Sequence, residues 1–126
     1  MGQTEIVIAL GGALGAVLRY SSSLFFGLHL PNKPYISTLL VNVFGSLLIG
    51  LFYYLSELFD VKEAFRLFFV VGFLGSLTTF SAFSYEFMNM VNEKSFLLAA
   101  NYIILNISLS GLCILIFIRF LKHWAI

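Results

Sequence analysis

The most informative segment of the chain reads Gly72-Phe-Leu-Gly-Ser-Leu-Thr-Thr-Phe-Ser-Ala-Phe-Ser84. It lies in an apolar run, residues 67–85, that carries no charged side chain and matches the length of about 20 residues that a helix needs to cross a bilayer. Glycine is about 1 kcal/mol less favourable than alanine inside a helix, and serine and threonine hydroxyls compete for backbone hydrogen bonds. The stretch therefore predicts a membrane-spanning helix that is broken near Gly75–Thr79.

Three further spans surround this one. Residues 34–56 and 95–118 are also free of charged side chains, and an apolar run from Ile6 reaches Leu28 if Arg19 is tolerated. No segment alternates polar and apolar residues as a membrane strand would. The sequence thus predicts an all-α integral membrane protein, one domain over residues 1–126, with helices near 4–28, 36–57, 64–91 and 96–122.

The composition excludes most soluble functions. Of 126 residues, 60% are hydrophobic and 10% are charged, whereas a soluble domain carries about 25% charged residues. The net charge of +1 gives no basic face for nucleic acid, and the short loops leave no room for a soluble catalytic domain, so we expect no enzyme. Residues 1–5 lack the basic start of a signal peptide and are expected to stay in the mature protein.

The basic residues give only a small orientation bias. Four of them (Lys62, Arg66, Arg119 and Lys122) fall on the side that holds both termini and the middle loop, and two (Lys33 and Lys94) fall on the other. Orientation follows this excess. A difference this small is compatible with insertion both ways up, and hence with an antiparallel dimer.

Two stripes of polar residues run along the predicted helices, because positions four apart share a helical face. Thr38, Asn42 and Ser46 form one stripe, and a second follows the last helix with Tyr102, Asn106 and Ser110. Polar side chains in the hydrocarbon region mark functional sites, and neutral hydrogen-bond donors suit a path for a small anion. Hydrogen bonding between helices is the alternative interpretation of both stripes.

Three other features of the spans have competing interpretations. Arg19 can snorkel to the interface, line a vestibule that attracts anions, or pair with a carboxylate such as Glu86. Phe80 and Phe83 share a face just beyond the expected break, and phenylalanine usually means packing. The pair Gly11 and Gly15 is interpreted as a site of close helix packing.

Three motifs together resemble a known family. The third-span motif 72–83, Gly11-Gly-Ala-Leu-Gly-Ala-Val-Leu-Arg-Tyr20 and Thr38-Leu-Leu-Val-Asn-Val-Phe-Gly45 are similar to the signature segments of the fluoride channels of the Fluc (CrcB) family. The resemblance covers essentially the whole chain, including its length and its four spans. It implies a four-helix channel domain in a prokaryotic plasma (inner) membrane that lets fluoride leave the cytoplasm passively and so reduces fluoride toxicity.

The resemblance also implies an assembly and a set of site residues. It implies an antiparallel dual-topology homodimer in membrane lipid, with two fluoride pores and a structural Na⁺ at its centre held by the backbone carbonyls of Gly75 and Thr78 from both subunits. The pore residues that it and the polar stripes indicate are Thr38, Asn42, Phe80, Phe83, Tyr102, Ser110 and Arg19. Ala82 and Asn106 depart from the family pattern or have no clear counterpart in it.

Two other classes of membrane protein compete with a channel. Small multidrug-resistance exporters are also short four-helix dimers, but they use a glutamate within the first helix, where this chain has no acid after Glu5 and offers Arg19 instead. A non-transporting assembly subunit, in which every polar residue joins helices, is the third interpretation. Fluoride conductance in liposomes separates the channel from both.

Overall fold

The computed structural model describes residues 2–124, and this part of the chain is helical with no strand. Its first, second and last spans are single helices; the third is built from four consecutive pieces, α3, η1, α4 and α5. The elements are α1 (Gln3–His29), α2 (Tyr35–Leu58), α3 (Glu63–Arg66), the π-helix η1 (Leu67–Leu74), α4 (Gly75–Leu77), α5 (Phe80–Asn92) and α6 (Phe96–Trp124). The four predicted spans are confirmed.

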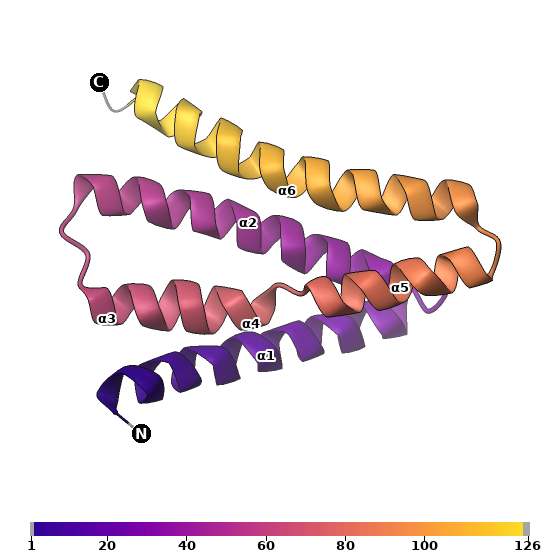
Figure 1. The fold of residues 1–126 in the computed structure, drawn as a ribbon, viewed down its shortest axis with the longest axis horizontal. Helices are drawn as coiled ribbons and strands as arrows, with labels where there is room; N and C mark the ends of the chain where they lie inside the picture. Colours follow the sequence, from indigo (N-terminus) through magenta and orange to yellow (C-terminus); the bar gives the residue numbers. More distant parts are fainter. Residues whose placement is uncertain (1, 125–126) are drawn as a thin grey trace.

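The spans alternate in direction (Figure 1). Both ends of the chain and the connection 59–62 lie at one end of the bundle, while the connections 30–34 and 93–95 lie at the other. Pro31 and Pro34 lie in the first of these short connections, where proline's missing donor and fixed φ stop a helix. Lys94 turns the chain with a φ of 58°.

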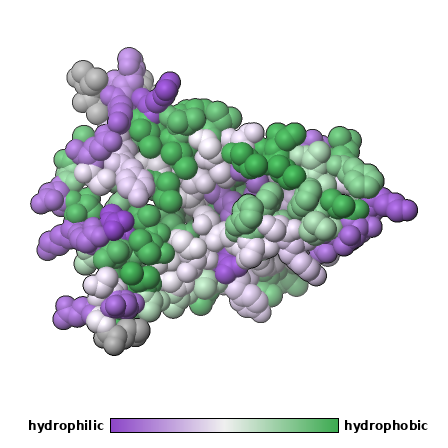
Figure 2. All heavy atoms as spheres, in the orientation of Figure 1, coloured by the Kyte–Doolittle hydropathy of each residue, from purple (hydrophilic) through white to green (hydrophobic). Residues whose placement is uncertain are grey.

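Four helices within the described residues are long and apolar enough to cross a membrane: Gln3–His29, Tyr35–Leu58, Glu63–Asn92 and Phe96–His123. Many large apolar side chains point outward along them, among them Leu10, Leu14 and Val17 of α1. Figure 2 shows hydrophilic residues gathered at the two ends of the molecule and hydrophobic residues spread between them. Lipid is the solvent that such a surface requires, so the protein is a multi-pass membrane protein.

The first half of the third span packs against α1 through glycines. A Cβ added to Gly11 would overlap the carbonyl oxygen of Phe68, and one added to Gly15 would overlap that of Phe73. A Cβ on Gly72 would in turn meet the backbone of α1. Small residues let helix backbones approach closely in membranes, so the predicted packing role of Gly11 and Gly15 is confirmed.

The third span loses its helical backbone at two residues. Helix α4 ends at Leu77; Thr78 (ψ 154°) and Thr79 (φ −150°, ψ 126°) are extended, and α5 begins at Phe80. The Thr79 side chain accepts a hydrogen bond of 3.2 Å from the amide of Ala82. Threonine is a favourable N-cap because its hydroxyl satisfies a free amide of the first turn. This segment faces α2, which lies between the third span and α6 (Figure 1).

Candidate functional site

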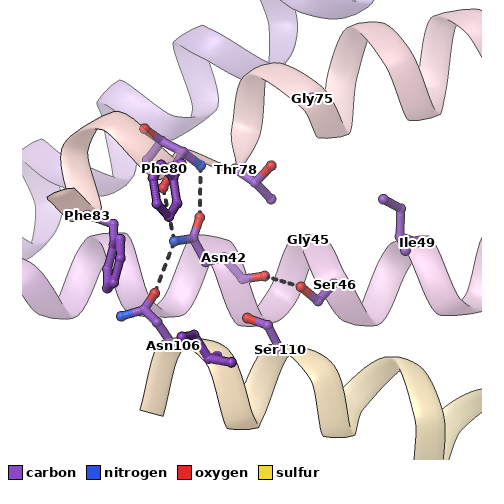
Figure 3. A pocket seen from close by; sticks show the side chains of 12 residues that line it. Asn42, Gly45, Ser46, Ile49, Gly75, Thr78, Phe80, Phe83, Asn106 and Ser110 are labelled. Atoms are coloured by element: carbon purple, nitrogen blue, oxygen red, sulfur yellow. Dashed lines mark hydrogen bonds between the residues drawn. The ribbon is translucent and has the colours of Figure 1, made fainter. Parts of the chain in front are cut away.

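A groove of about 400 Å³, mostly apolar in surface but bearing several amide and hydroxyl groups, lies beside the extended residues Thr78 and Thr79. It is formed where α2, the interrupted span and α6 meet (Figure 3). Its lining has no charged side chain and consists of Asn42, Gly45, Ser46, Ile49, Gly75, Thr78, Thr79, Phe80, Phe83, Asn106, Ile107 and Ser110. The groove thus gathers two members of each polar stripe, the paired phenylalanines and part of the third-span motif at one place, called the polar groove below.

Asn42 occupies the middle of the polar groove (Figure 3). Its Oδ1 accepts a hydrogen bond of 2.8 Å from the backbone amide of Thr79, and its Nδ2 donates to the carbonyl of Thr79 at 3.1 Å. The same Nδ2 donates to Oδ1 of Asn106 at 3.1 Å. One side chain of α2 therefore ties the extended segment of the third span to α6.

The extended segment leaves two backbone carbonyls without their helical partners. In a continuous helix the carbonyl of Gly75 would accept from the amide of Thr79, and that of Thr78 would accept from the amide of Ala82. Here the Thr79 amide donates to Asn42 and the Ala82 amide donates to the Thr79 hydroxyl. These two carbonyl oxygens are therefore available for another ligand, and Gly75 is exposed in the single chain.

The aromatic residues of the polar groove differ in exposure. Phe80 is 78% exposed, whereas Phe83 is 9% exposed and packs on Tyr102 with ring centroids 5.2 Å apart. The rings of Phe80 and Phe83 are tilted by 43° with centroids 5.4 Å apart. Because the edge of an aromatic ring carries its positive charge density, such a pair can present weakly positive edges to an anion.

The hydroxyls of the polar groove have different partners. Ser46 donates to the backbone carbonyl of Asn42 at 2.8 Å, and Thr78 donates to that of Leu74 at 2.9 Å. Within residues 2–124 no hydrogen bond involves the Ser110 hydroxyl, which lines the groove from α6. Ser110 is therefore a hydroxyl in the groove that is free to donate to a bound ion.

Two predicted pore residues lie outside the polar groove, around a carboxylate. Thr38 donates to Oε1 of Glu86 at 2.9 Å, and the Tyr102 hydroxyl donates to Oε2 at 2.5 Å. Thr38 and Tyr102 are 5% and 2% exposed. Glu86 also borders a second cavity of about 300 Å³ beside the connection 30–34. From the sequence, Glu86 was named only as a possible partner for Arg19. The sequence signal that could have revealed Glu86 as a hydrogen-bond acceptor for other spans was its position as a carboxylate inside a predicted span.

Arg19 contacts the third span from α1, just before the interruption. Its Nε donates to the backbone carbonyl of Ser76 at 2.9 Å. Both Glu86 oxygens accept from Thr38 and Tyr102, and among the described residues no ion pair joins Arg19 to Glu86, so the structure does not support the interpretation that pairs them. The guanidinium thus provides a donor for a carbonyl just before the interruption. A backbone oxygen freed from its helix needs such a donor inside a membrane.

The fold and the groove define a class of protein: a small four-span membrane protein with an uncharged, donor-bearing site beside an interrupted helix. The comparisons with known proteins agree with this class. Residues 6–118 match the model of the family described as CrcB-like protein, Camphor Resistance (CrcB). The chain belongs to the CrcB family, as the three sequence motifs predicted.

Similar proteins in bacteria carry a functional name. A protein of Shewanella oneidensis named fluoride-specific ion channel FluC is 44% identical over 108 residues, which cover 82% of this chain and 84% of the relative. Proteins of the same name from Shewanella baltica and from a further Shewanella strain are 42% and 43% identical over the same shares. The relatives are named as ion channels, not as enzymes, in agreement with the prediction.

Proposed function

We propose that the protein is a fluoride-selective channel that lets fluoride leave the cytoplasm passively and thereby reduces fluoride toxicity. The observation that carries the proposal is the polar groove itself, which joins residues of two of the three family motifs, those of α2 and of the third span, at one uncharged site. The names of the Shewanella relatives support the choice of fluoride. A negative membrane potential favours the exit of an anion through such a passive route.

The chemistry of the groove suits a small, strongly hydrated anion. Neutral amide and hydroxyl donors can replace part of the hydration shell without holding the ion as firmly as a fixed cation would, and conduction requires binding that also releases. The Ser110 hydroxyl and the edges of Phe80 and Phe83 supply this environment. The bulk of the two rings would restrict the route against larger anions such as chloride.

We also propose that two copies of the chain assemble as an antiparallel, dual-topology homodimer with two pores. Phe80 and Gly75 line the polar groove yet are exposed in the single chain. A second copy that covers this side would turn an open groove into an enclosed route and bring two interrupted spans together. The small difference in basic residues between the two sides permits both orientations.

The freed carbonyls suggest where the structural Na⁺ of the proposed dimer would bind. Those of Gly75 and Thr78 lack amide partners because the Thr79 and Ala82 amides bond to side chains. Carbonyl oxygens are hard ligands that suit a hard cation, so the residues present fit the ion. Its expected effect is structural: the melting temperature of the purified protein in detergent should rise in Na⁺ relative to K⁺ or choline, and equal melting temperatures would contradict the site.

Fluoride efflux tests the channel. The purified protein is reconstituted in liposomes loaded with potassium fluoride, and efflux is followed with a fluoride electrode after valinomycin opens a path for potassium. We expect rapid efflux that depends on valinomycin and needs no proton gradient, with slow chloride efflux under the same conditions. Absent fluoride efflux would favour an assembly subunit, and efflux that requires a proton gradient would favour a coupled exporter.

A further inference from the structure

Asn106 is buried on α6, where it forms hydrogen bonds to the backbone carbonyl of Tyr102 and to the side chain of Asn42. It is 7% exposed, its Nδ2 donates to the backbone carbonyl of Tyr102 at 3.1 Å, and its Oδ1 accepts from Nδ2 of Asn42 at 3.1 Å. A backbone carbonyl can only accept a hydrogen bond. The Tyr102 carbonyl therefore turns the amino end of the Asn106 carboxamide toward itself and the oxygen end toward Asn42.

The orientation of Asn106 in turn favours one orientation of the Asn42 carboxamide. Facing the acceptor Oδ1 of Asn106, the carboxamide of Asn42 must present its Nδ2. Its Oδ1 then points at the backbone amide of Thr79, which it accepts at 2.8 Å. Rotating the carboxamide by half a turn would place a donor against the Thr79 amide and an acceptor against Oδ1 of Asn106. The rotated oxygen would also face the Thr79 carbonyl, so three pairs of like groups would face each other inside the membrane, where unsatisfied polar groups are costly.

We propose that Asn106 is a positioning residue for the ion pathway, which acts together with the Thr79 backbone to fix the carboxamide orientation of Asn42. The correct orientation captures the Thr79 amide, and this capture keeps Thr78 and Thr79 out of the helix and the Gly75 carbonyl free. The polar groove at the extended segment depends on this chain of hydrogen bonds from α6 through α2 to the third span. The role in ion passage rests on the proposed fluoride channel; the hydrogen-bond relay does not.

The relay also changes the role expected for Asn42. A carboxamide has two N–H bonds, and Nδ2 of Asn42 donates both to protein oxygens, those of Thr79 and Asn106. Asn42 therefore holds the site together in this conformation and does not have a free donor for an anion. The donors that remain for the ion include the second N–H of Asn106 and the Ser110 hydroxyl.

Amide hydrogen exchange at Thr79 tests the relay without any fluoride measurement. Asn106→Leu removes the acceptor that orients Asn42, whereas Asn106→Asp keeps an acceptor at the same place. Loss of one hydrogen bond of ordinary strength should speed exchange of the Thr79 amide by about five- to tenfold in Asn106→Leu. Asn106→Asp should stay within about twofold of the wild-type protein. Residue-level exchange by mass spectrometry of the detergent-solubilised protein measures both.

The amide of Thr78 is the internal control, because it donates to the Leu74 carbonyl at 3.0 Å and has no contact with the relay. Its exchange should not change. Asn42→Ala and the double variant Asn42→Ala with Asn106→Leu should exchange equally at Thr79, since Asn106 acts through Asn42. Unchanged Thr79 exchange in Asn106→Leu, or equal acceleration at Thr78 and Thr79, would overturn the proposal. If Asn106→Leu does not fold, Asn106→Ala deletes the same bonds with a smaller side chain, and loss of folding in both while Asn106→Asp folds would support the relay.

Fluoride efflux then connects the relay to transport. Asn106→Leu should conduct fluoride about tenfold more slowly than the wild-type protein if the extended segment shapes the route. Slower efflux together with faster Thr79 exchange supports the full proposal. Faster exchange with unchanged efflux would remove the role in the ion pathway. A wild-type protein that conducts no fluoride would overturn the channel and leave the exchange result as the test of the relay.

Discussion

The two halves of the third span meet their neighbours by different physical means. The half before the interruption, η1 and α4, packs on α1, where the glycines Gly11, Gly15 and Gly72 remove side chains so that backbones touch. The half after it, α5, contacts α2 and α6 beside Asn42, Glu86 and Tyr102, which join these elements by hydrogen bonds. Close packing therefore holds the span in place, while directional hydrogen bonds shape the polar groove.

The two kinds of contact should respond differently to mutation. A contact between backbones tolerates no added atom, because the helix itself must move to make room. A contact made by hydrogen bonds between side chains tolerates changes of size better and fails when a donor or acceptor is lost. Substitutions in the first half should therefore act on folding, and those in the second half should act on local order and on ion passage.

Gly15→Ala should have the largest effect and tests the packed half. The added Cβ would overlap the carbonyl oxygen of Phe73, a backbone atom that cannot turn aside. We expect a loss of about 3 kcal/mol in the free energy of unfolding, the upper part of the range for overpacking. Thermal denaturation in detergent measures it, with Gly111→Ala as the control, since no atom lies within 4 Å of the Cβ added there. Similar melting temperatures for the two variants would contradict the comparison.

Tyr102→Phe should have the next largest effect and tests the hydrogen-bonded half. It removes the 2.5 Å bond to Glu86 and leaves the aromatic contact with Phe83 in place. A hydrogen bond to a charged group contributes about 1.5–3 kcal/mol, and we expect a loss of about 2 kcal/mol in the free energy of unfolding. Tyr20→Phe on the exposed face of α1 is the matched control. Equal stability of the two variants would show that the bond to Glu86 contributes nothing.

Phe80→Ala should lower fluoride efflux about tenfold, equivalent to about 1.4 kcal/mol in the barrier, with little change in the melting temperature. The ring is 78% exposed in the single chain, so its loss removes little packing there while it removes an edge from the groove. Phe96→Ala, an exposed phenylalanine at the start of α6, should leave efflux unchanged. Fluoride efflux at the wild-type rate in Phe80→Ala would contradict the proposed role of the aromatic pair.

Lys122→Gln should have the smallest effect and provides a baseline outside both halves. Lys122 pairs with Glu57 at 3.2 Å between the ends of α6 and α2, with both side chains more than half exposed. Exposed ion pairs contribute about 0–1 kcal/mol, and we expect a change below about 0.5 kcal/mol in the free energy of unfolding. A larger loss would mean that this end of the bundle depends on charge pairing more than its exposure indicates.

Most of the fold was predictable because the length of an apolar run nearly determines whether that run crosses the membrane as a helix. Each run without charges has to cross the bilayer as a helix that satisfies its own backbone, and the four spans, the short connections and the packing of Gly11 and Gly15 follow from that. The family was predictable from three motifs in order. The partners of Arg19 and Glu86 were not, because a sequence gives the spacing of polar groups along a helix and not the neighbour that each one meets.

The candidate site was predictable in part for the same reason. Spacing of four residues correctly suggested that Asn42 and Asn106 belong to polar faces, and the structure brings both into one groove. Spacing did not reveal that the amides bond to each other or that Thr38 and Tyr102 meet at Glu86. These pairings depend on the rotation of each helix about its axis, which packing between spans sets.

The lipid environment, the number of spans and the family could be inferred from the amino-acid sequence alone, because they depend on the order of apolar, small and polar residues along the chain. Which polar groups satisfy one another, and which carbonyls and hydroxyls stay free, depends on how the helices pack in three dimensions. The physical reason is that a hydrogen bond needs a donor and an acceptor within about 3 Å of each other, and groups distant in sequence reach that separation only when the spans have packed.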